Sequence, residues 1–527
     1  MRSSNGSKYT VGGKNMKRTV IVTLLILLSC SLVFATGAKE EPGTAAATTY
    51  KEEVVIGVQS RTSSTNPTSQ TSVAHKIMFN LTHNGFVGYD ERTKEILPEL
   101  ATQWKVSSDL KTWTFTLRDD VYFHNGEKFT ADDVLFTWEY GKSASNATVK
   151  SFWNSVESVK AIDDYHVDLV LKAANIDLLH LLSNEYFAIL NREAVTADAT
   201  KGPDIGTGPY VNKEFFSGDY TLLERFDRYW GEAPVTKTLR FRYLPEGTAR
   251  LAALENGEID VCQAPNNTEL DIVKANSDLV LNTWQTTALT FLALNTEDPI
   301  LSDPNLRLAI AYAIKVQDVI DGAASGFAGT ANGMWGYFQY GFFDDWKSVG
   351  QSSYETNLAT AKEYMAKSKS PNGATLKFTA ASAWTVNALQ IIQDQLKALN
   401  ITVEIEQVDA AGLSRKSVSG DYQVIIYSVT FTSAGSDAAR IFTPGNSVNY
   451  ARYNNARVNE LFSLGASETD DAKRKAYYKE IQTIVHAECP YIPLYYANSG
   501  VAHSKVAEGA VYNTSGSHDY TYIKVAK

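Results

Sequence analysis

The sequence predicts an α/β protein with mixed sheets and more than one domain. With 527 residues, the chain exceeds the length at which a single hydrophobic core keeps growing. Strand-like segments with a two-residue period are interspersed with segments of helical period along the whole chain. Hydrophobic residues make up 44% of the sequence, which is enough for sizeable cores. We therefore expect several packed units that combine strands and helices.

The first expected elements follow a polar linker. Val54–Val58 is typical of a buried strand, and Val73–Leu81 of a helix. We expect one strand within Val159–Leu171, where Val167, Leu169 and Leu171 alternate with polar residues. Later segments predict a helix from Leu251 ending at Gly257, a strand at Phe291–Asn295, a helix capped by Ser302–Pro304, a helix at Ala388–Leu399, strands at Ile401–Ile405 and Gln423–Val429, and a helix containing Arg474, Tyr477 and Ile481.

The segment Pro98–Val134 has the most distinctive local pattern. Trp113, Phe115 and Leu117 alternate with threonines, as in a half-buried strand. A second apolar run begins at Val121 and Phe123, and Asn125-Gly126 then favours a tight turn. Thr130 and Asp133 have the spacing of a helix N-cap and its reciprocal partner. The segment therefore predicts a strand, a turn and a capped helix, with His124 as a structural hydrogen-bonding residue.

The first residues are interpreted as a targeting sequence. Lys14, Lys17 and Arg18 precede an uncharged run, Thr19–Ala35, so residues 1–38 predict a secretory signal peptide, with Met16 as the more natural start. Ordinary cleavage near residues 35–38 is our first interpretation. Lipidation of Cys30, in a segment that resembles a lipobox, is the alternative. Residues 39–50 predict a flexible linker, and no later apolar run has the length needed to span a membrane.

Composition excludes some functions. The formal charge of −10 and the pI of about 5.4 argue against a nucleic-acid partner. The 28 Tyr, 22 Phe and 9 Trp residues can pack cores or line a stacking cleft. The eight histidines are dispersed, and the sequence carries no familiar nucleophile, phosphate-loop or zinc motif. We therefore expect no enzyme activity, no cofactor and no metal. Cys262 and Cys489 could pair or remain two separate buried thiols.

Several motifs carry a resemblance to a known family. Pro98, Leu100, Ala101 and Trp104, followed by Phe123, His124, Gly126 and Phe129–Val134, resemble the signature of the family 5 extracytoplasmic solute-binding proteins of ABC importers. Gly206–Tyr210 (GTGPY) and Leu251–Asp260 resemble further family motifs. Asn125 stands where the family usually has Asp, a change that preserves the turn chemistry.

The resemblance implies a two-lobed periplasmic-binding-protein type II fold with an extra subdomain inserted in the first lobe. By this comparison, lobe I comprises residues 51–85, 206–288 and 497–527, the inserted subdomain residues 86–205, and lobe II residues 289–496. The two lobes would be joined near residues 286–290 and 493–497. We expect a monomer that binds a short peptide between the lobes and delivers it to permease subunits in the membrane. Oligosaccharide binding in the same transport role is the alternative, and a secreted hydrolase is a remote one.

The expected ligand residues come from the same resemblance. Asp437 matches the aspartate that holds a peptide N-terminus in relatives, although its loop departs from the family form, and a helix-capping or exposed role is the alternative. Trp384 would lie against the ligand or serve in packing. Arg440 could pair with Asp437 or with a ligand carboxylate, although a surface ion pair is the simpler interpretation. The remaining candidates are Thr65, Asn66, Trp335 with its neighbour Tyr337, and Phe431.

Overall fold

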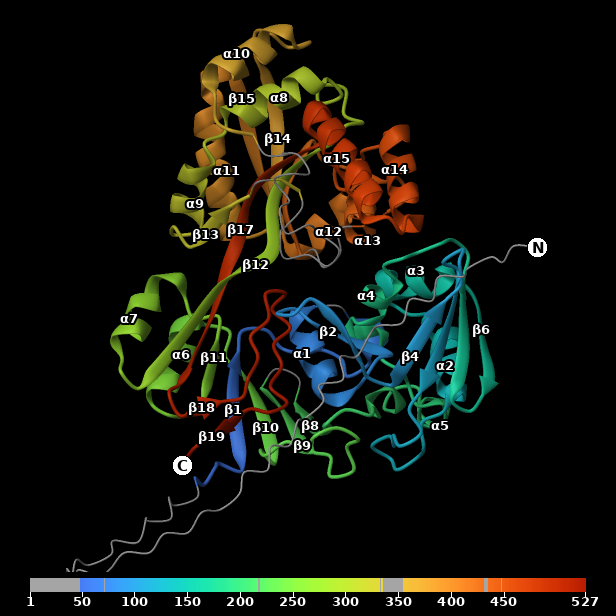
Figure 1. The fold of residues 1–527 in the computed structure, drawn as a ribbon. Coiled ribbons are helices and arrows are strands. Elements are labelled where there is room, and N and C mark those ends of the chain that lie inside the picture. Colours follow the sequence, from blue (N-terminus) through green and yellow to red (C-terminus); the bar gives the residue numbers. More distant parts are fainter. Residues whose placement is uncertain are drawn as a thin grey trace, which may run out of the picture. The chain divides into compact units, whose positions relative to one another are not determined.

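The computed structural model describes residues 48–70, 72–216, 219–331, 333–334, 354–430, 435–446 and 448–527, with only the backbone described at residues 383, 436 and 437. Strands and helices are interspersed through these ranges (Figure 1). None of the helices found there is long and apolar enough to cross a membrane. The candidate residues Trp335, Tyr337 and Phe431, as well as Cys30, lie outside the described residues.

A large mixed sheet contains 11 strands within the described residues. Its order is β15 (Ile401–Gln407), β14 (Ala374–Ala380), β16 (Val424–Thr430), β12 (Leu279–Leu294), β17 (Tyr491–Ser504), β11 (Val261–Gln263), β1 (Glu53–Val58), β10 (Thr238–Tyr243), β9 (Tyr220–Arg225) and β8 (Tyr210–Phe216), with β13 (Ala328–Thr330) paired to β17. β1 runs parallel to β10 and β11, whereas β9 is antiparallel to β10. The expectation of mixed sheets is thus confirmed.

Three smaller sheets complete the strand inventory of the described chain. A four-stranded sheet has the order β4 (Ala101–Val106), β5 (Thr112–Leu117), β7 (His166–Leu171) and β6 (Val156–Asp163). The two-stranded sheets are β2 (Val87–Asp90) with β3 (Glu95–Pro98), and β18 (Ala507–Glu508) with β19 (Lys524–Val525). The four-stranded sheet lies wholly within the residues predicted for the inserted subdomain. The domain boundaries themselves stay predictions.

Helices accompany each sheet. Those in the lobe I segments are α1 (Val73–Thr82), α6 (Gly247–Glu255) and α7 (Leu270–Ala275). The inserted segment holds α2 (Ala131–Gly141), α3 (Ala147–Ser155), α4 (Leu178–Leu182) and α5 (Arg192–Ala197). The lobe II segment holds α8 (Pro304–Ala313), α9 (Val316–Ala323), α10 (Leu358–Lys367), α11 (Ala383–Leu396), α12 (Ala410–Ser419), α13 (Ser436–Phe442), α14 (Ala456–Ser467) and α15 (Asp471–Glu488).

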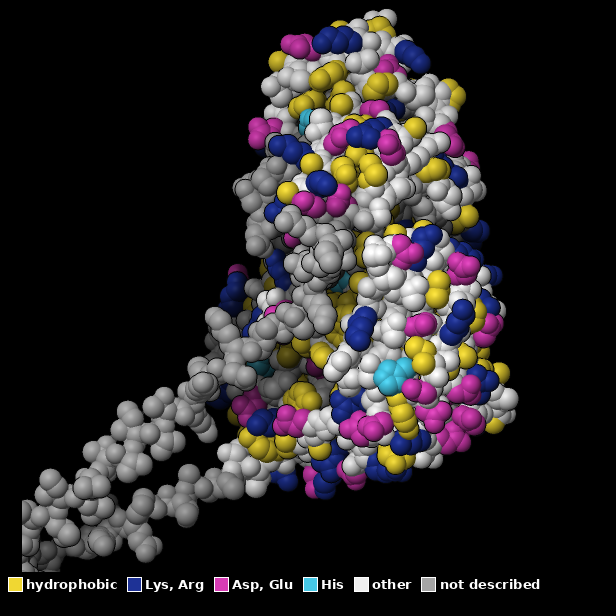
Figure 2. All heavy atoms as spheres, turned by 45° about the vertical axis from the view of Figure 1, so that its right-hand side comes forward, with side chains coloured by type: hydrophobic (Ala, Val, Ile, Leu, Met, Phe, Trp, Pro, Cys, Tyr) yellow, Lys and Arg dark blue, Asp and Glu magenta, His cyan; other side chains and the backbone are white. Residues whose placement is uncertain are grey.

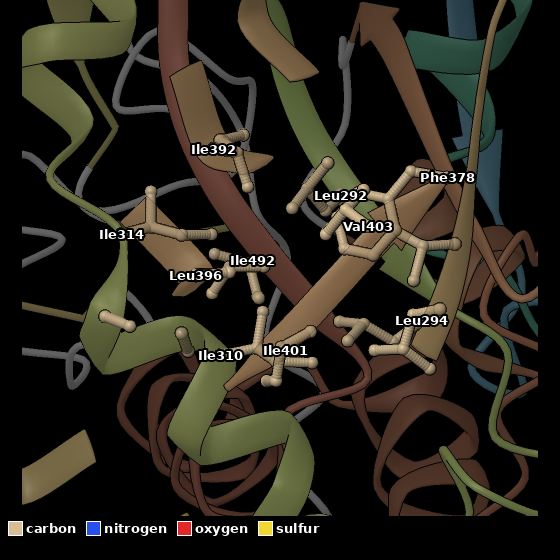
Figure 3. Close-up of a cluster of buried hydrophobic side chains, with 14 of the residues drawn as sticks. Leu292, Leu294, Ile310, Ile314, Phe378, Ile392, Leu396, Ile401, Val403 and Ile492 are labelled. Carbon is tan, nitrogen blue, oxygen red and sulfur yellow. The ribbon is translucent and has the colours of Figure 1, made fainter. Parts of the chain in front are cut away.

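β12 contains an uninterrupted run of apolar residues because both of its faces are covered. Leu292 and Leu294 pack in one core with side chains of α8, α11 and β15, as Figure 3 shows. The alternating residues Phe291 and Ala293 pack in a second core with residues of α13, α14 and α15. A strand that is covered on both faces needs apolar side chains at every position. The run Phe291–Leu294 is therefore apolar throughout, and all four of its residues are fully buried.

The predicted cap of α2 is confirmed. The backbone N–H of Thr130 donates to Asp133 Oδ2 at 3.0 Å, and the Thr130 hydroxyl oxygen accepts from the N–H of Asp132 at 3.3 Å. Gly126 adopts a φ of 90°, which glycine tolerates and which closes the turn before the helix. The run at Val121 and Phe123 forms no named strand, because its ladder is a single bridge between Tyr122 and Lys128.

The prediction of a single strand within Val159–Leu171 is wrong. The chain reverses there and forms two antiparallel strands, β6 and β7. Asp163 makes the reversal possible, because its Oδ1 accepts from the N–H of Tyr165 at 2.9 Å and so mimics a backbone turn. The apolar alternation that predicted one strand belongs to β7 alone.

The two cysteines of the folded part do not pair. Cys262 and Cys489 are both free and both buried. Cys262 lies on β11, and Cys489 follows α15. Of the two alternatives left open by the sequence, the structure has two separate thiols.

The first and last described residues are joined. The N–H of Lys51 donates to Val525 O at 2.8 Å, and the N–H of Lys527 donates to Thr49 O at 2.9 Å. Tyr50 and Ala526 form an antiparallel bridge between these two hydrogen bonds. Both ends of the described chain are thus fixed beside β1 and β19.

Candidate ligand-binding site

Two long strands connect the two halves of the large sheet. β12 and β17 are antiparallel over most of their length, but their register shifts between Gln285 and Leu289 (Figure 1). Thr286 bridges this gap, since its Oγ1 donates to Ala497 O at 2.7 Å and accepts from the N–H of Ala288 at 3.1 Å. The irregularity falls in the segment that we predict as a crossing between lobes, and a break in a ladder is a natural place for bending.

In lobe II, the carboxyl ends of the parallel strands point toward this crossing. β16 is antiparallel to β12 and places Thr430 opposite Ala288. β14 is parallel to β16, so it ends on the same side. The segments that follow these strands lead into α11, which carries Trp384, and α13, which carries Asp437. Ligands of open α/β sheets bind at such strand ends.

The ends of strands in the lobe I segments also face the crossing, from the other half of the sheet. β11 pairs with β17 so that Gln263 lies opposite Val501, closer to the crossing than the pair Val261 and His503. Because β1 is parallel to β11, the loop after β1 also faces the crossing. Thr65 and Asn66 belong to that loop. The topology therefore directs the two candidate loops of lobe I and lobe II to the same crossing.

Asn66 has a structural task in its loop. Its Oδ1 accepts from the N–H of Thr68 at 2.9 Å and so caps the short 3-10 helix η1 (Pro67–Ser69). Its Nδ2 donates to Tyr140 Oη at 3.1 Å on α2 of the inserted subdomain. Thr65 beside it is half-buried. The two polar groups of the Asn66 side chain are thus engaged by the protein.

The lobe II candidates occupy the first turns of two helices. The Trp384 side chain is 40% exposed, although its size would favour burial. Asp437 lies on α13, with its backbone alone described. Arg440, one turn later, donates from Nη2 to Thr148 Oγ1 at 3.2 Å on α3. Arg440 thus connects lobe II to the inserted subdomain, a contact that the sequence did not predict.

A small polar pocket lies on the lobe I side of the crossing. Its volume is about 70 Å³, and its lining includes Lys76, Glu91, Glu185, Thr287 and the segment 513–515. Lys76 Nζ lies 3.9 Å from Glu185 Oε2. Glu91 Oε2 accepts from Thr514 Oγ1 at 2.6 Å. The pocket thus presents charges of both signs beside the crossing strand.

Thr287 connects the pocket to the crossing. Only 4% of this residue is exposed, and its Oγ1 has no hydrogen-bond partner within the described ranges. A buried hydroxyl without a partner is costly, so such groups are usually paired with protein, water or ligand. The sequence does not indicate these pocket residues, because they come from separate segments, none of which has a distinctive local pattern.

A larger cavity of about 390 Å³ shares Tyr89, Glu91 and Glu185 with the pocket and adds Glu99 and Asp519. Burial raises the pKa of Glu99 to about 7 against the opposing effect of the Gly85 N–H, and Glu185 raises it further. Carboxyl groups predominate among the charged side chains that line this cavity, which favours positively charged or hydrogen-bond-donating groups. Elsewhere, side chains of both signs are interspersed on the face drawn in Figure 2. Among the described residues, no group of three or more His, Cys, Asp or Glu side chains could hold a metal ion.

Several known proteins are similar to this chain. The profile of the family described as "Bacterial extracellular solute-binding proteins, family 5 Middle" matches residues 95–449. The chain is 26% identical over 448 residues to the probable D,D-dipeptide-binding periplasmic protein DdpA of Escherichia coli (strain K12), covering 80% of this chain and 84% of that protein. It is 25% identical to the dipeptide-binding protein of the same organism, covering 84% and 89%.

The fold also matches solved structures. The periplasmic binding protein DppA from Helicobacter pylori, in complex with the peptide STSA, superposes with a TM-score of 0.77 at 24% identity, covering 91% of this chain and 99% of that chain. The likeness confirms the two-lobed type II fold predicted from the sequence motifs.

Proposed function

The chain belongs to the family 5 bacterial extracellular solute-binding proteins, and from this premise we propose that it binds short peptides at the β12–β17 crossing for an ABC importer. The observation that carries the proposal is the convergence on the crossing of strand ends from both halves of the sheet. Several relatives are named for peptides or dipeptides, which supports the same ligand class.

The chemistry of the site suits a zwitterion. A peptide brings an ammonium group and a carboxylate, and neither can be buried without a partner of opposite charge. Glu91 and Glu185 offer carboxylates near the crossing, and Lys76 offers an ammonium group. Asp437 remains our candidate for the peptide N-terminus and Trp384 for a packing surface. Arg440 on α13, and Thr65 and Asn66 in the loop after β1, remain further candidates.

Binding would act by population shift. A ligand that contacts both lobes only when they approach each other favours the closed arrangement, and no covalent step is needed. A micromolar affinity corresponds to roughly −8 kcal/mol, which one buried ion pair and aromatic burial can supply. The closed, loaded protein would then be the form that permease subunits receive.

The proposed role places the mature protein outside the cytoplasm. We propose that residues 1–38 are removed as a signal peptide, with lipidation of Cys30 as the alternative processing. Intact-mass analysis of the processed protein distinguishes the two, because a lipidated product begins at Cys30 and carries acyl chains.

Native mass spectrometry of protein purified without denaturation tests the ligand class by identifying any retained molecule. Calorimetry with di- to pentapeptides beside cello- and manno-oligosaccharides then measures preference. We expect peptide binding that weakens at least about tenfold in Asp437→Ala and Trp384→Ala. The exposed Phe216, which is 55% exposed on β8, provides a matched control as Phe216→Ala. Tight sugar binding without peptide binding would contradict the proposal.

A further inference from the structure

A buried ion pair joins the inserted subdomain to lobe II. Arg474 Nη2 on α15 lies 2.5 Å from Asp177 Oδ1, and the two side chains are only 9% and 4% exposed. Asp177 directly precedes α4, 297 positions from its partner. One backbone hydrogen bond accompanies the pair, from the N–H of Ile176 to Ala466 O at 3.0 Å. Two parts of the chain that are distant in sequence are thus in direct contact.

Burial alone lowers the pKa of Arg474, but Asp177 and Tyr478 raise it above its ordinary value, so the guanidinium stays charged. Removing one partner of a buried pair leaves the other charge without compensation. Beside the pair lies a cavity of about 320 Å³, lined mainly by apolar side chains including Phe152, Phe462 and Tyr478.

Gly435 connects this ion pair to the ligand-binding loop. A methyl group on Gly435 would overlap the Asp177 carboxylate and lie 2.8 Å from Tyr478 Oη. The backbone of Gly435 therefore lies directly against Asp177. Gly435 also begins α13 and stands two positions before Asp437, at the point where the segment after β16 enters the helix. A displacement of Asp177 would remove this packing contact from the backbone at Gly435.

A second contact holds the same helix. Arg440 donates to Thr148 on α3, 3.2 Å away. The inserted subdomain therefore contacts the N-cap residue of α13, Gly435, and also Arg440 within the helix. A helix of 7 residues has little independent stability, so contacts of this kind decide its position.

We propose that Asp177 is a positioning residue for the ligand-binding segment of lobe II, acting through Arg474 and the backbone of Gly435. The inserted subdomain then contributes to ligand binding without contacting the ligand. This proposal rests on the proposed function, in which α13 carries part of the peptide site. Neither Asp177 nor Arg474 needs to contact the ligand. Their effect on affinity would come from the placement of Asp437.

The first test needs no ligand. Hydrogen exchange measured by mass spectrometry on the full protein should show α13 amides exchanging about tenfold faster in Asp177→Asn, with β14 and α11 unchanged. The swap Asp177→Arg with Arg474→Asp should restore part of the protection. Gly435→Ala tests the same contact from the side of α13 and should cause the same local loss of protection from hydrogen exchange.

Arg457→Gln is the matched control. It breaks an exposed pair with Glu480, 2.7 Å apart, which joins α14 to α15, the helix that also carries Arg474. It should leave α13 exchange unchanged. Unchanged α13 exchange in both Asp177→Asn and Gly435→Ala, or a uniform increase across lobe II, would overturn the proposal.

The second test uses trialanine as the probe. Asp177→Asn should bind it at least about tenfold more weakly than the original protein while its unfolding midpoint changes little, and the double swap should recover affinity. An original protein that binds no peptide but shows the local exchange effect would refute the peptide proposal and support the positioning role. Normal trialanine affinity in Asp177→Asn would refute the positioning role alone.

Discussion

The His124 imidazole donates from Nε2 to the carbonyl oxygen of Gly208, 3.0 Å away, and accepts at Nδ1 from the N–H of Gly206 at 3.3 Å. The ring thus links two motifs 82 to 84 positions apart and is fixed as the neutral tautomer. Burial lowers its pKa to about 4, although the Gly208 carbonyl raises it slightly. These contacts support the structural role predicted for His124.

We expect His124→Gln to lower the free energy of unfolding by about 2 kcal/mol, because buried backbone groups of the GTGPY turn lose their partner. Urea denaturation measures the change. The exposed His166, paired with Asp163 at 2.8 Å, provides the control His166→Gln, which should change stability by less than about 0.5 kcal/mol. A variant of normal stability that has lost ligand binding would instead point to a role of His124 in the site.

The cap of α2 gives a second prediction. Thr130→Ala removes the side chain that accepts from the first turn and should cost about 1 kcal/mol of unfolding free energy. The exposed Thr200, in a turn, supplies the comparison Thr200→Ala. Equal denaturation midpoints for the two variants would argue against the cap as a source of stability.

Glu99 gives a prediction about pH. Its pKa rises from an ordinary 4.5 to about 7 in the folded protein, so the folded chain binds more protons than the unfolded chain between these values. The contribution of Glu99 to the free energy of unfolding therefore falls as pH rises from about 4.5 to about 7. Glu99→Gln mimics the protonated form and keeps an oxygen to accept from Gly85.

The variant should be increasingly more stable than the original protein as pH increases through this window. The buried histidines have pKa values that shift in the opposite direction, so the difference between the two proteins is the informative quantity. Urea midpoints at several pH values measure it, with the exposed Glu95→Gln on β3 as control. Parallel profiles for Glu99→Gln and the original protein would refute the prediction.

The cysteines give a fourth prediction. Cys262 and Cys489 are both 0% exposed. Burial raises the pKa of Cys262 to about 11 and that of Cys489 to about 12, so neither is a thiolate at pH 8. A thiol-reactive chromophore should label neither in the folded protein and both in denaturant. Labelling that requires prior reduction would mean that the two residues form a disulfide.

Local physics predicted most of the elements, and long-range contacts explain the exceptions. The alternation of Trp113, Phe115 and Leu117 predicted β5, because burial on one face of a strand imposes that period. The hairpin of β6 and β7 was missed because its turn depends on one aspartate side chain, without glycine or proline. The register shift between β12 and β17 depends on a partner strand some two hundred residues away, and the family resemblance alone indicated its place.

The site was less predictable than the fold. The resemblance pointed to Asp437 and Trp384, which lie on the helices that follow β16 and β14. It did not indicate the contact of Arg474 with Asp177, because nothing local to either residue shows that the other will compensate its buried charge. The polar pocket is likewise a product of the tertiary fold, since Lys76, Glu185, Thr287 and residues 513–515 come from widely separated parts of the chain.

The junction of Lys51 with Val525 determines how lobe motion can be observed. A fluorophore or surface linker at either end of the described chain reports on the same lobe, so a pair placed at both ends would register no closure. A distance reporter needs its second dye in lobe II, for which the exposed Val418 of α12, replaced by cysteine, is suitable. The dye would react selectively with the introduced cysteine, because the native thiols of Cys262 and Cys489 are buried in the folded protein.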